Sequence, residues 1–235
     1  MIRSQNAACF QHLIKGRRCG TVVTVPPIQQ RLQIQRPAQS KSSGCGQRFT
    51  NAPGFLSDHC QHVQIRARFP ARVDSEGTLF LLRQQDRGKW DQRLIAEGMR
   101  ALDRASAGDR ITAFHLEAGI AACHAAAPSW EATDWPQIVE LYDELLALTQ
   151  SPVVAMNRAV AVSRDEGALS GLAALDAIDN LDALDRYPLL PAIQAELWRE
   201  AGDADRAIAC YRAALGLARS GPEQRWLTSR LSLLV

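Results

Sequence analysis

The chain has 235 residues and a formal net charge of +2. No run of about 18 apolar residues occurs, so we expect no membrane-spanning helix. The N-terminus also lacks the continuous apolar stretch of a secretory signal. We therefore expect a cytoplasmic protein, in which Cys123 and Cys210 are free thiols within helices.

Charge divides the chain into two unequal parts. Residues 1–75 hold 11 basic and two acidic residues, a net charge of +9, whereas residues 76–235 hold 16 basic and 23 acidic residues, a net charge of −7. The first part has no apolar period, so we predict that residues 1–70 are disordered or irregular. Residues 71–235 are long enough for one hydrophobic core. A basic tail can bind phosphates, but no basic patch interleaved with aromatics supports a nucleic-acid site.

The cysteines and histidines of the first part are possible zinc ligands. These residues are Cys9, His12, Cys19, His59, Cys60 and His62. Structural zinc sites show paired spacings such as Cys-x2–4-Cys, and these six residues do not show such spacings. We expect no bound metal.

The second part shows helical periodicity almost throughout. An apolar run at 78–82 predicts a short extended segment. Asp86 then stands at the position of a helix cap. Apolar residues at helical spacing predict a helix over 90–104, with Trp90 on its apolar face, and another over 111–126.

Further helices follow at regular intervals. Thr133 or Asp134 caps a helix that begins near Trp135, and Ser151 opens the next one. Gly167 then turns the chain into a helix that carries apolar residues at 169–178. The remaining helices are expected over 188–200, over 203–219, and from Gly221 to the C-terminus.

Small and aromatic residues recur around Gly202 with the spacing of a tetratricopeptide helix-turn-helix. Gly167 lies 35 residues before Gly202, and Tyr142 lies 69 residues before Tyr211. The pattern comprises Trp135, Tyr142, Gly167, Ala195, Trp198, Gly202, Ala207, Tyr211 and Ala214. It predicts an all-α, tetratricopeptide-like solenoid of antiparallel helix hairpins, after a poorly ordered N-terminal segment.

No arrangement of residues indicates catalysis. His115 and His124 lie in an alanine-rich helix, and the sequence places no nucleophile or carboxylate beside them. The acidic residues of 176–185 recur every three positions, which is not the spacing of a calcium loop. We expect no enzyme activity and no cofactor.

Two groups of residues are candidates for binding a protein partner. Asn157 and Arg158 interrupt an apolar helix on the side that lines the groove of such arrays, where they could hold a peptide backbone or carboxylate. The alternative is that Asn157 bonds a neighbouring loop. The second group combines charged side chains with an aromatic ring. The alternative to partner binding is that this group supplies a helix cap and a tryptophan of the core. It comprises Asp86, Arg87, Trp90 and Asp91.

Residues 72–234 resemble the C-terminal, tetratricopeptide-like extension of bacterial extracytoplasmic-function RNA polymerase sigma factors. The matching strings are ARVD (71–74), QDRGKWD (85–91), LIAEG (94–98), AACHA (121–125), TDWPQIV (133–139) and SPVVAMNRAVAV (151–162). The resemblance implies a regulatory, protein-binding role in transcription initiation. The partners that it implies are core polymerase or sigma domains.

The chain departs from that family before residue 70. Members carry two sigma domains there, and nothing in residues 1–70 resembles either of them. We therefore interpret the protein as a truncated sigma factor that does not bind promoter DNA by itself. On this hypothesis the first 65 or so residues are not authentic family sequence. The alternative is a free-standing helical-repeat adaptor with an unrelated partner.

Overall fold

The computed structural model describes residues 63–73, 80–106 and 111–235, and the expectations for residues 1–62 lie outside them. The predicted all-α class is confirmed, and the described residues form no strand element. The α-helices are α4 (Gln92–Ala105), α5 (Ala113–Ala126), α6 (Trp135–Thr149), α7 (Pro152–Asp165), α8 (Ala168–Asp176), α9 (Leu189–Glu200), α10 (Ala204–Leu217) and α11 (Gly221–Leu231). Short 3-10 helices are η2 (Phe69–Ala71), η3 (Leu82–Gln84), η4 (Arg87–Lys89) and η5 (Leu181–Leu184).

Side-chain caps and glycines set where the helices begin. The carboxylates of Asp91, Asp134 and Asp203 accept hydrogen bonds from backbone N–H groups in the first turns of α4, α6 and α10. Gly167 and Gly202 adopt φ angles of 102° and 85°. Glycine reaches this region without the strain that a Cβ would add, which explains the turns between α7 and α8 and between α9 and α10.

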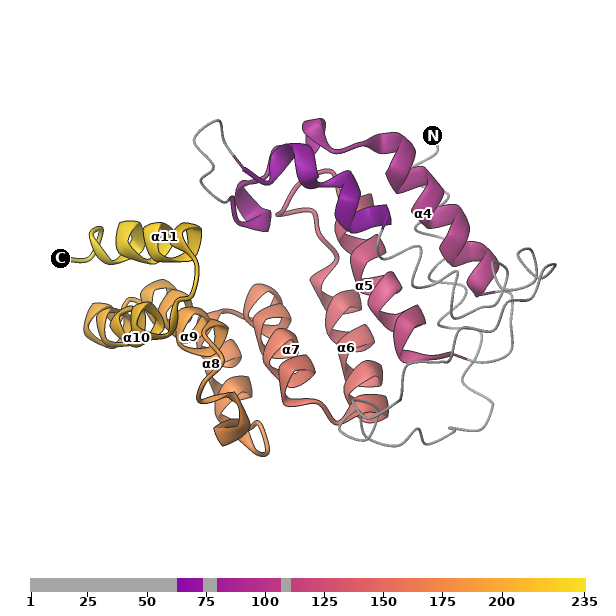
Figure 1. Cartoon of the computed structure of the whole chain (residues 1–235). Helices are drawn as coiled ribbons and strands as arrows, with labels where there is room; N and C mark the ends of the chain where they lie inside the picture. Colours follow the sequence, from indigo (N-terminus) through magenta and orange to yellow (C-terminus); the bar gives the residue numbers. More distant parts are fainter. Residues whose placement is uncertain (1–62, 74–79, 107–110) are drawn as a thin grey trace, which may run out of the picture.

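From α4 to α11, each helix packs against the next one along the chain (Figure 1). The core is therefore a row of clusters between neighbours. Ile138, Leu141 and Leu145 of α6 pack against Leu116 and Ile120 of α5. Such nearest-neighbour packing is typical of helical-repeat proteins.

Four residues of the repeat pattern pack where α9, α10 and α11 meet. Ala195, Ala207 and Ala214 are completely buried there, and Tyr211 fills the space beside them. Small side chains let the backbones of two helices approach closely. Trp198 and Tyr142 are half-buried against neighbouring clusters.

The structure corrects several local expectations. Asp86 caps only the short η4, whereas Asp91 caps α4, because a one-turn 3-10 helix intervenes. Trp90 consequently precedes α4 rather than lying within it. The apolar run at 78–82 leads into η3 at Leu82, and residues 78–79 lie outside the described part. The last helix ends at Leu231, short of the predicted C-terminal extent.

A small cluster lies at the N-terminal edge of the described chain. Ala67 and Ala71 are buried with Trp90 and Ile95, and Ala125 of α5 packs against them. Residues 63–67 are helical. The expected domain boundary at residue 70 therefore falls inside a packed cluster. None of the described helices is both long and apolar enough to span a bilayer.

Candidate protein-docking surface

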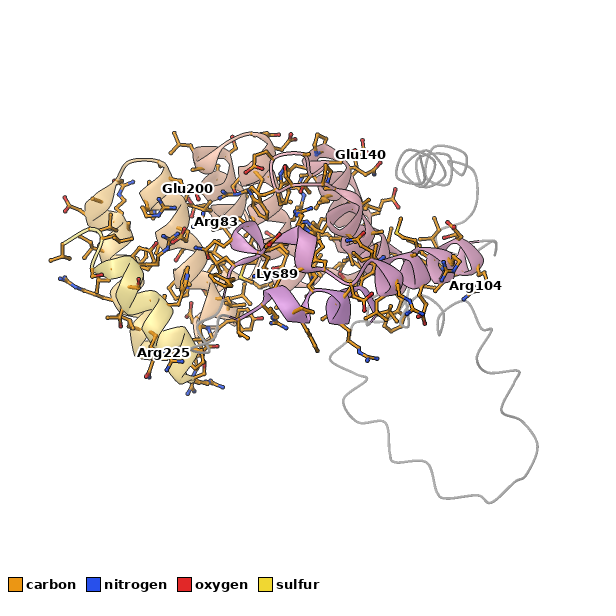
Figure 2. The ribbon with its side chains drawn as sticks, turned by 90° about the horizontal axis from the view of Figure 1, so that it is seen from above. Arg83, Lys89, Arg104, Glu140, Glu200 and Arg225 are labelled. Carbon is orange, nitrogen blue, oxygen red and sulfur yellow. The ribbon has the colours of Figure 1, made fainter. Side chains whose placement is uncertain are left out.

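The segment before α4 lies against the C-terminal ends of α5 and α9. We call residues 80–91 the strap. It bonds the end of α5 through Arg87 and the end of α9 through Arg83. Figure 2 shows Arg83 beside Glu200, with the strap over the helices of the array. The C-terminal end of a helix carries unpaired carbonyls and a partial negative charge, which favours arginine there.

Arg87 holds one end of the strap. Its Nη1 donates to the carbonyl oxygens of His124 and Ala127, both at 2.8 Å, and its Nη2 donates to Thr133 Oγ1 at 3.2 Å. The guanidinium also lies 4.9 Å from the ring centre of Trp90, which is 3% exposed. Burial lowers the pKa of Arg87, and the nearby charge of Glu131 partly opposes this.

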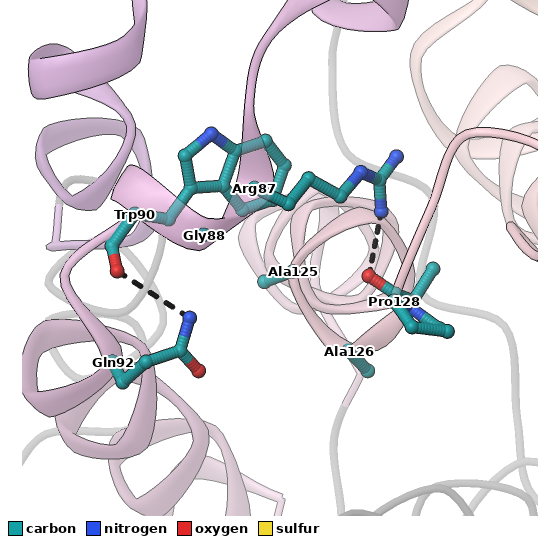
Figure 3. A pocket seen from close by; sticks show the side chains of 8 residues that line it. Arg87, Gly88, Trp90, Gln92, Ala125, Ala126 and Pro128 are labelled. Atoms are coloured by element: carbon teal, nitrogen blue, oxygen red, sulfur yellow. Dashed lines mark hydrogen bonds between the residues drawn. The ribbon is translucent and has the colours of Figure 1, made fainter.

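A cavity of about 320 Å³ lies beside this contact (Figure 3). Arg87 reaches over Ala125 at one side of it, and the amide of Gln92 donates to the Trp90 carbonyl at another. Alanines of α5 and Pro128 form the remaining wall. Because the Arg87 guanidinium is already bonded to three oxygens, it holds the strap rather than pointing into open space.

Arg83 holds the other end of the strap. Its Nη2 lies 2.9 Å from Glu196 Oε2, and its Nη1 lies 3.1 Å from Glu200 Oε1. We call these two glutamates of α9 the acidic pair. Arg164 of α7 donates to Glu200, and Arg230 of α11 donates to Glu196. These contacts join the strap to α7, α9 and α11.

Glu196 is the centre of this network and is only 12% exposed. It accepts hydrogen bonds from Tyr211 Oη, Arg199 and Arg230 as well as from Arg83. Burial alone would raise the pKa of Glu196. The hydrogen bonds and the arginine charges outweigh burial and lower the pKa to about 2. The carboxylate is thus held ionised by its partners.

The proposed partner-binding residues do not come together on one surface. Asn157 is exposed and lies seven residues, or two turns, before Arg164, so both share one face of α7. The side chain of Arg158 instead forms an ion pair with Asp143 of the neighbouring helix α6. Asp86 and Asp91 cap η4 and α4. The sequence showed these residues but not the acidic pair, whose link to the strap spans 113 residues.

The two histidines of α5 have different surroundings. His115 is buried, and its Nε2 lies 3.2 Å from the Ala105 carbonyl at the end of α4. His124 packs edge-on against Trp135 at 5.3 Å between ring centres. Burial, then the charges of Arg68 and Arg87, lowers the pKa of His124 to about 4. Among the described residues, no three His, Cys, Asp or Glu side chains form a metal-binding group.

We expect His124 to make stability depend on pH between about 6.5 and 4. The unfolded state binds a proton below the ordinary histidine pKa, whereas the folded state stays neutral until about pH 4. The free energy of unfolding should therefore fall by roughly 1–3 kcal/mol as the pH drops through this window. Urea unfolding at pH 7 and at pH 5 measures this change in the free energy of unfolding. His124→Gln should flatten the dependence, and an unchanged slope in that variant would contradict the assignment.

Comparisons with known proteins find the following similarities. The model of a family of unknown function (DUF6596) matches residues 63–106, the stretch that carries the Trp90 cluster, the strap and α4. The uncharacterized protein R00370 of Rhizobium meliloti (strain 1021) is 36% identical over 174 residues, which cover 74% of this chain and 40% of that relative. The chain thus spans about two fifths of the relative's length. No solved structure is significantly similar.

Proposed function

We propose that this chain is a protein-binding helical array acting in the cytoplasm as the regulatory C-terminal part of a sigma-factor-like protein. The resemblance of residues 72–234 to the extension of extracytoplasmic-function sigma factors supports this role. The partners would be sigma domains or core RNA polymerase. The chain would bind them without catalysis and without contacting promoter DNA itself.

The observation that carries the proposal is the two-point attachment of the strap. Arg87 fixes it to the end of α5, and Arg83 fixes it to α9. The cluster of Ala67, Ala71 and Trp90 is fixed with it. A partner domain that contacts residues 63–73 would therefore be held at a defined position relative to α5–α9, as a regulatory extension requires.

A capture experiment tests the proposal. The tagged chain is incubated with purified core polymerase and, separately, with the two sigma domains of an extracytoplasmic-function sigma factor. We expect saturable retention of at least one of them. Retention of neither would overturn the sigma-factor assignment and leave the free-standing adaptor as the better interpretation.

Asn157 and Arg158 provide a variant for the same experiment. Asn157 is exposed, and Arg158 pairs with the exposed carboxylate of Asp143. Exposed ion pairs contribute about 0–1 kcal/mol, so replacing both residues by alanine should leave the melting temperature nearly unchanged. If the face of α7 contacts the partner, capture should weaken. A large fall in melting temperature would show instead that the two residues are structural.

A further inference from the structure

The segment before the strap turns large apolar side chains outward. In residues 63–73 the alanines are buried, whereas Phe69 and Val73 are 52% and 48% exposed. Phe80, where the strap begins, is 38% exposed, and its N–H donates to the Arg72 carbonyl oxygen at 2.9 Å. This hydrogen bond brings the three exposed side chains onto one edge of the molecule. Exposed apolar side chains that gather in this way are typical of interaction sites.

The arginines between these side chains have no acidic partner among the described residues. Residues 63–73 hold three arginines, among them Arg68 and Arg72, and no acidic residue. The Arg72 guanidinium lies 5.9 Å from the ring centre of Phe69. Burial lowers the pKa of Arg68, and the charges of Arg72 and Arg87 lower it further. Arg68 is therefore a partly buried cation whose charged neighbours are also cations.

The array beside this segment carries the opposite charge. Residues 111–235 hold nine basic and 17 acidic residues, a net charge of −8. Several arginines of the array are already paired with carboxylates of the array, namely Arg158, Arg164, Arg199 and Arg230. The array thus supplies its own counter-charges, and residues 63–73 do not. An acidic partner would be repelled by the array and attracted to this segment.

We propose that Arg68, Phe69, Arg72, Val73 and Phe80, together called the basic edge, dock a segment of a protein partner that carries carboxylates beside apolar side chains. The inference deepens the proposed binding function and rests on it. A guanidinium takes a carboxylate through two parallel hydrogen bonds. The two phenylalanine rings and Val73 would cover the apolar side chains of the partner. The incoming carboxylates would also offset the repulsion between the two arginines.

A nucleic acid also presents anions and flat rings, but the surroundings favour a protein segment. A single strand is charged along its whole length, and proteins that bind one offer a positive groove that follows its backbone. Here the basic edge adjoins an array of net charge −8. A protein segment can confine its carboxylates to the positions opposite Arg68 and Arg72. The separation of charge therefore selects a short acidic segment over a long polyanion.

Fluorescence anisotropy with the full chain tests the basic edge. The probe is a short fluorescein-labelled peptide of glutamate and leucine, compared with a peptide in which glutamine replaces glutamate. The glutamate peptide should bind about fivefold or more tightly than the glutamine peptide, and added salt should reduce the difference. The Arg68→Gln/Arg72→Gln chain should lose this preference, and Phe69→Ala should weaken the binding of both peptides. Circular dichroism confirms that each variant is folded.

Two further variants serve as controls. Replacing Arg212 and Arg225 by glutamine removes the same charge from exposed positions of α10 and α11 and should leave the affinity nearly unchanged. Asp74 and Glu76 are the acidic residues that follow the segment in the sequence. Replacing both by their amides should also leave the affinity nearly unchanged. A large gain in affinity there would show that the chain neutralises the arginines itself, which would overturn the inference.

The inference is also overturned if the unaltered chain binds neither peptide or binds both equally, or if the Arg68→Gln/Arg72→Gln chain, folded, keeps the preference. Tighter binding of a labelled single-stranded oligonucleotide, lost in the same variant, would assign the surface to nucleic acid instead. Capture of polymerase or sigma domains that this variant retains would leave the proposed function intact and remove only the basic edge. Peptide preference without such capture would assign the basic edge to a different acidic partner.

Discussion

Replacing Gly171 by alanine should destabilise the protein by about 2–3 kcal/mol, although alanine is ordinarily the better helix former. Gly171 lies in α8 where this helix crosses α7. A Cβ at this position would stand 2.3 Å from the Ser163 Cβ and 3.1 Å from the Ala159 carbonyl oxygen. Neither neighbour is the movable end of a long side chain, so the two helices would have to separate. Urea denaturation monitored by circular dichroism measures the effect.

Gly216 of α10 is the matched control. Nothing lies within 4 Å of a Cβ built there, and its φ angle is not positive. Gly216→Ala should therefore raise the free energy of unfolding by roughly 0.5–1 kcal/mol. Opposite signs for the two substitutions would support the close contact of α7 with α8. A stabilising Gly171→Ala would show that these helices pack differently.

Replacing Glu196 by glutamine should have the second large effect, a loss of about 2–4 kcal/mol. The substitution removes the charge that Arg83, Arg199 and Arg230 share. Those guanidinium groups would then repel one another across the ends of three helices. Urea denaturation monitored by circular dichroism near pH 7 measures this loss of stability. Because the pKa of Glu196 is lowered to about 2, its contribution is present above the ordinary glutamate pKa and lost as the pH falls toward 2.

Asp143 provides the control for Glu196. It also pairs with an arginine, Arg158, but its side chain is 51% exposed, against 12% for Glu196. Asp143→Asn should change stability by less than about 1 kcal/mol. Equal losses in the two variants would mean that the network around Glu196 is no more buried than an ordinary surface pair.

The helices could be predicted because their signals are local. The starts of α6 and α10 follow from the carboxylates of Asp134 and Asp203, and the turns follow from Gly167 and Gly202. The same reasoning was wrong at Asp86. A capping carboxylate before a one-turn 3-10 helix looks the same in sequence as one before a long α-helix, so the pattern at Asp86 could not distinguish the two.

The candidate docking surface could be predicted only in part. The QDRGKWD string predicts a charged and aromatic group, and the structure places Arg87 and Trp90 of this string together at the end of α5. The contacts of Arg83 and Arg230 with Glu196 cross 113 and 34 residues. No periodicity within one helix carries information about such pairs, because they depend on how the successive hairpins are stacked.

The strap is held on the array through Arg83 and the acidic pair. A double-mutant cycle tests it most directly, with Arg83→Gln, Glu196→Gln and the double variant compared by urea unfolding at low ionic strength. We expect a coupling energy of about 1 kcal/mol or more, which moderate salt reduces. A coupling within about 0.3 kcal/mol of zero would contradict the claim, because the two side chains would then not interact in solution.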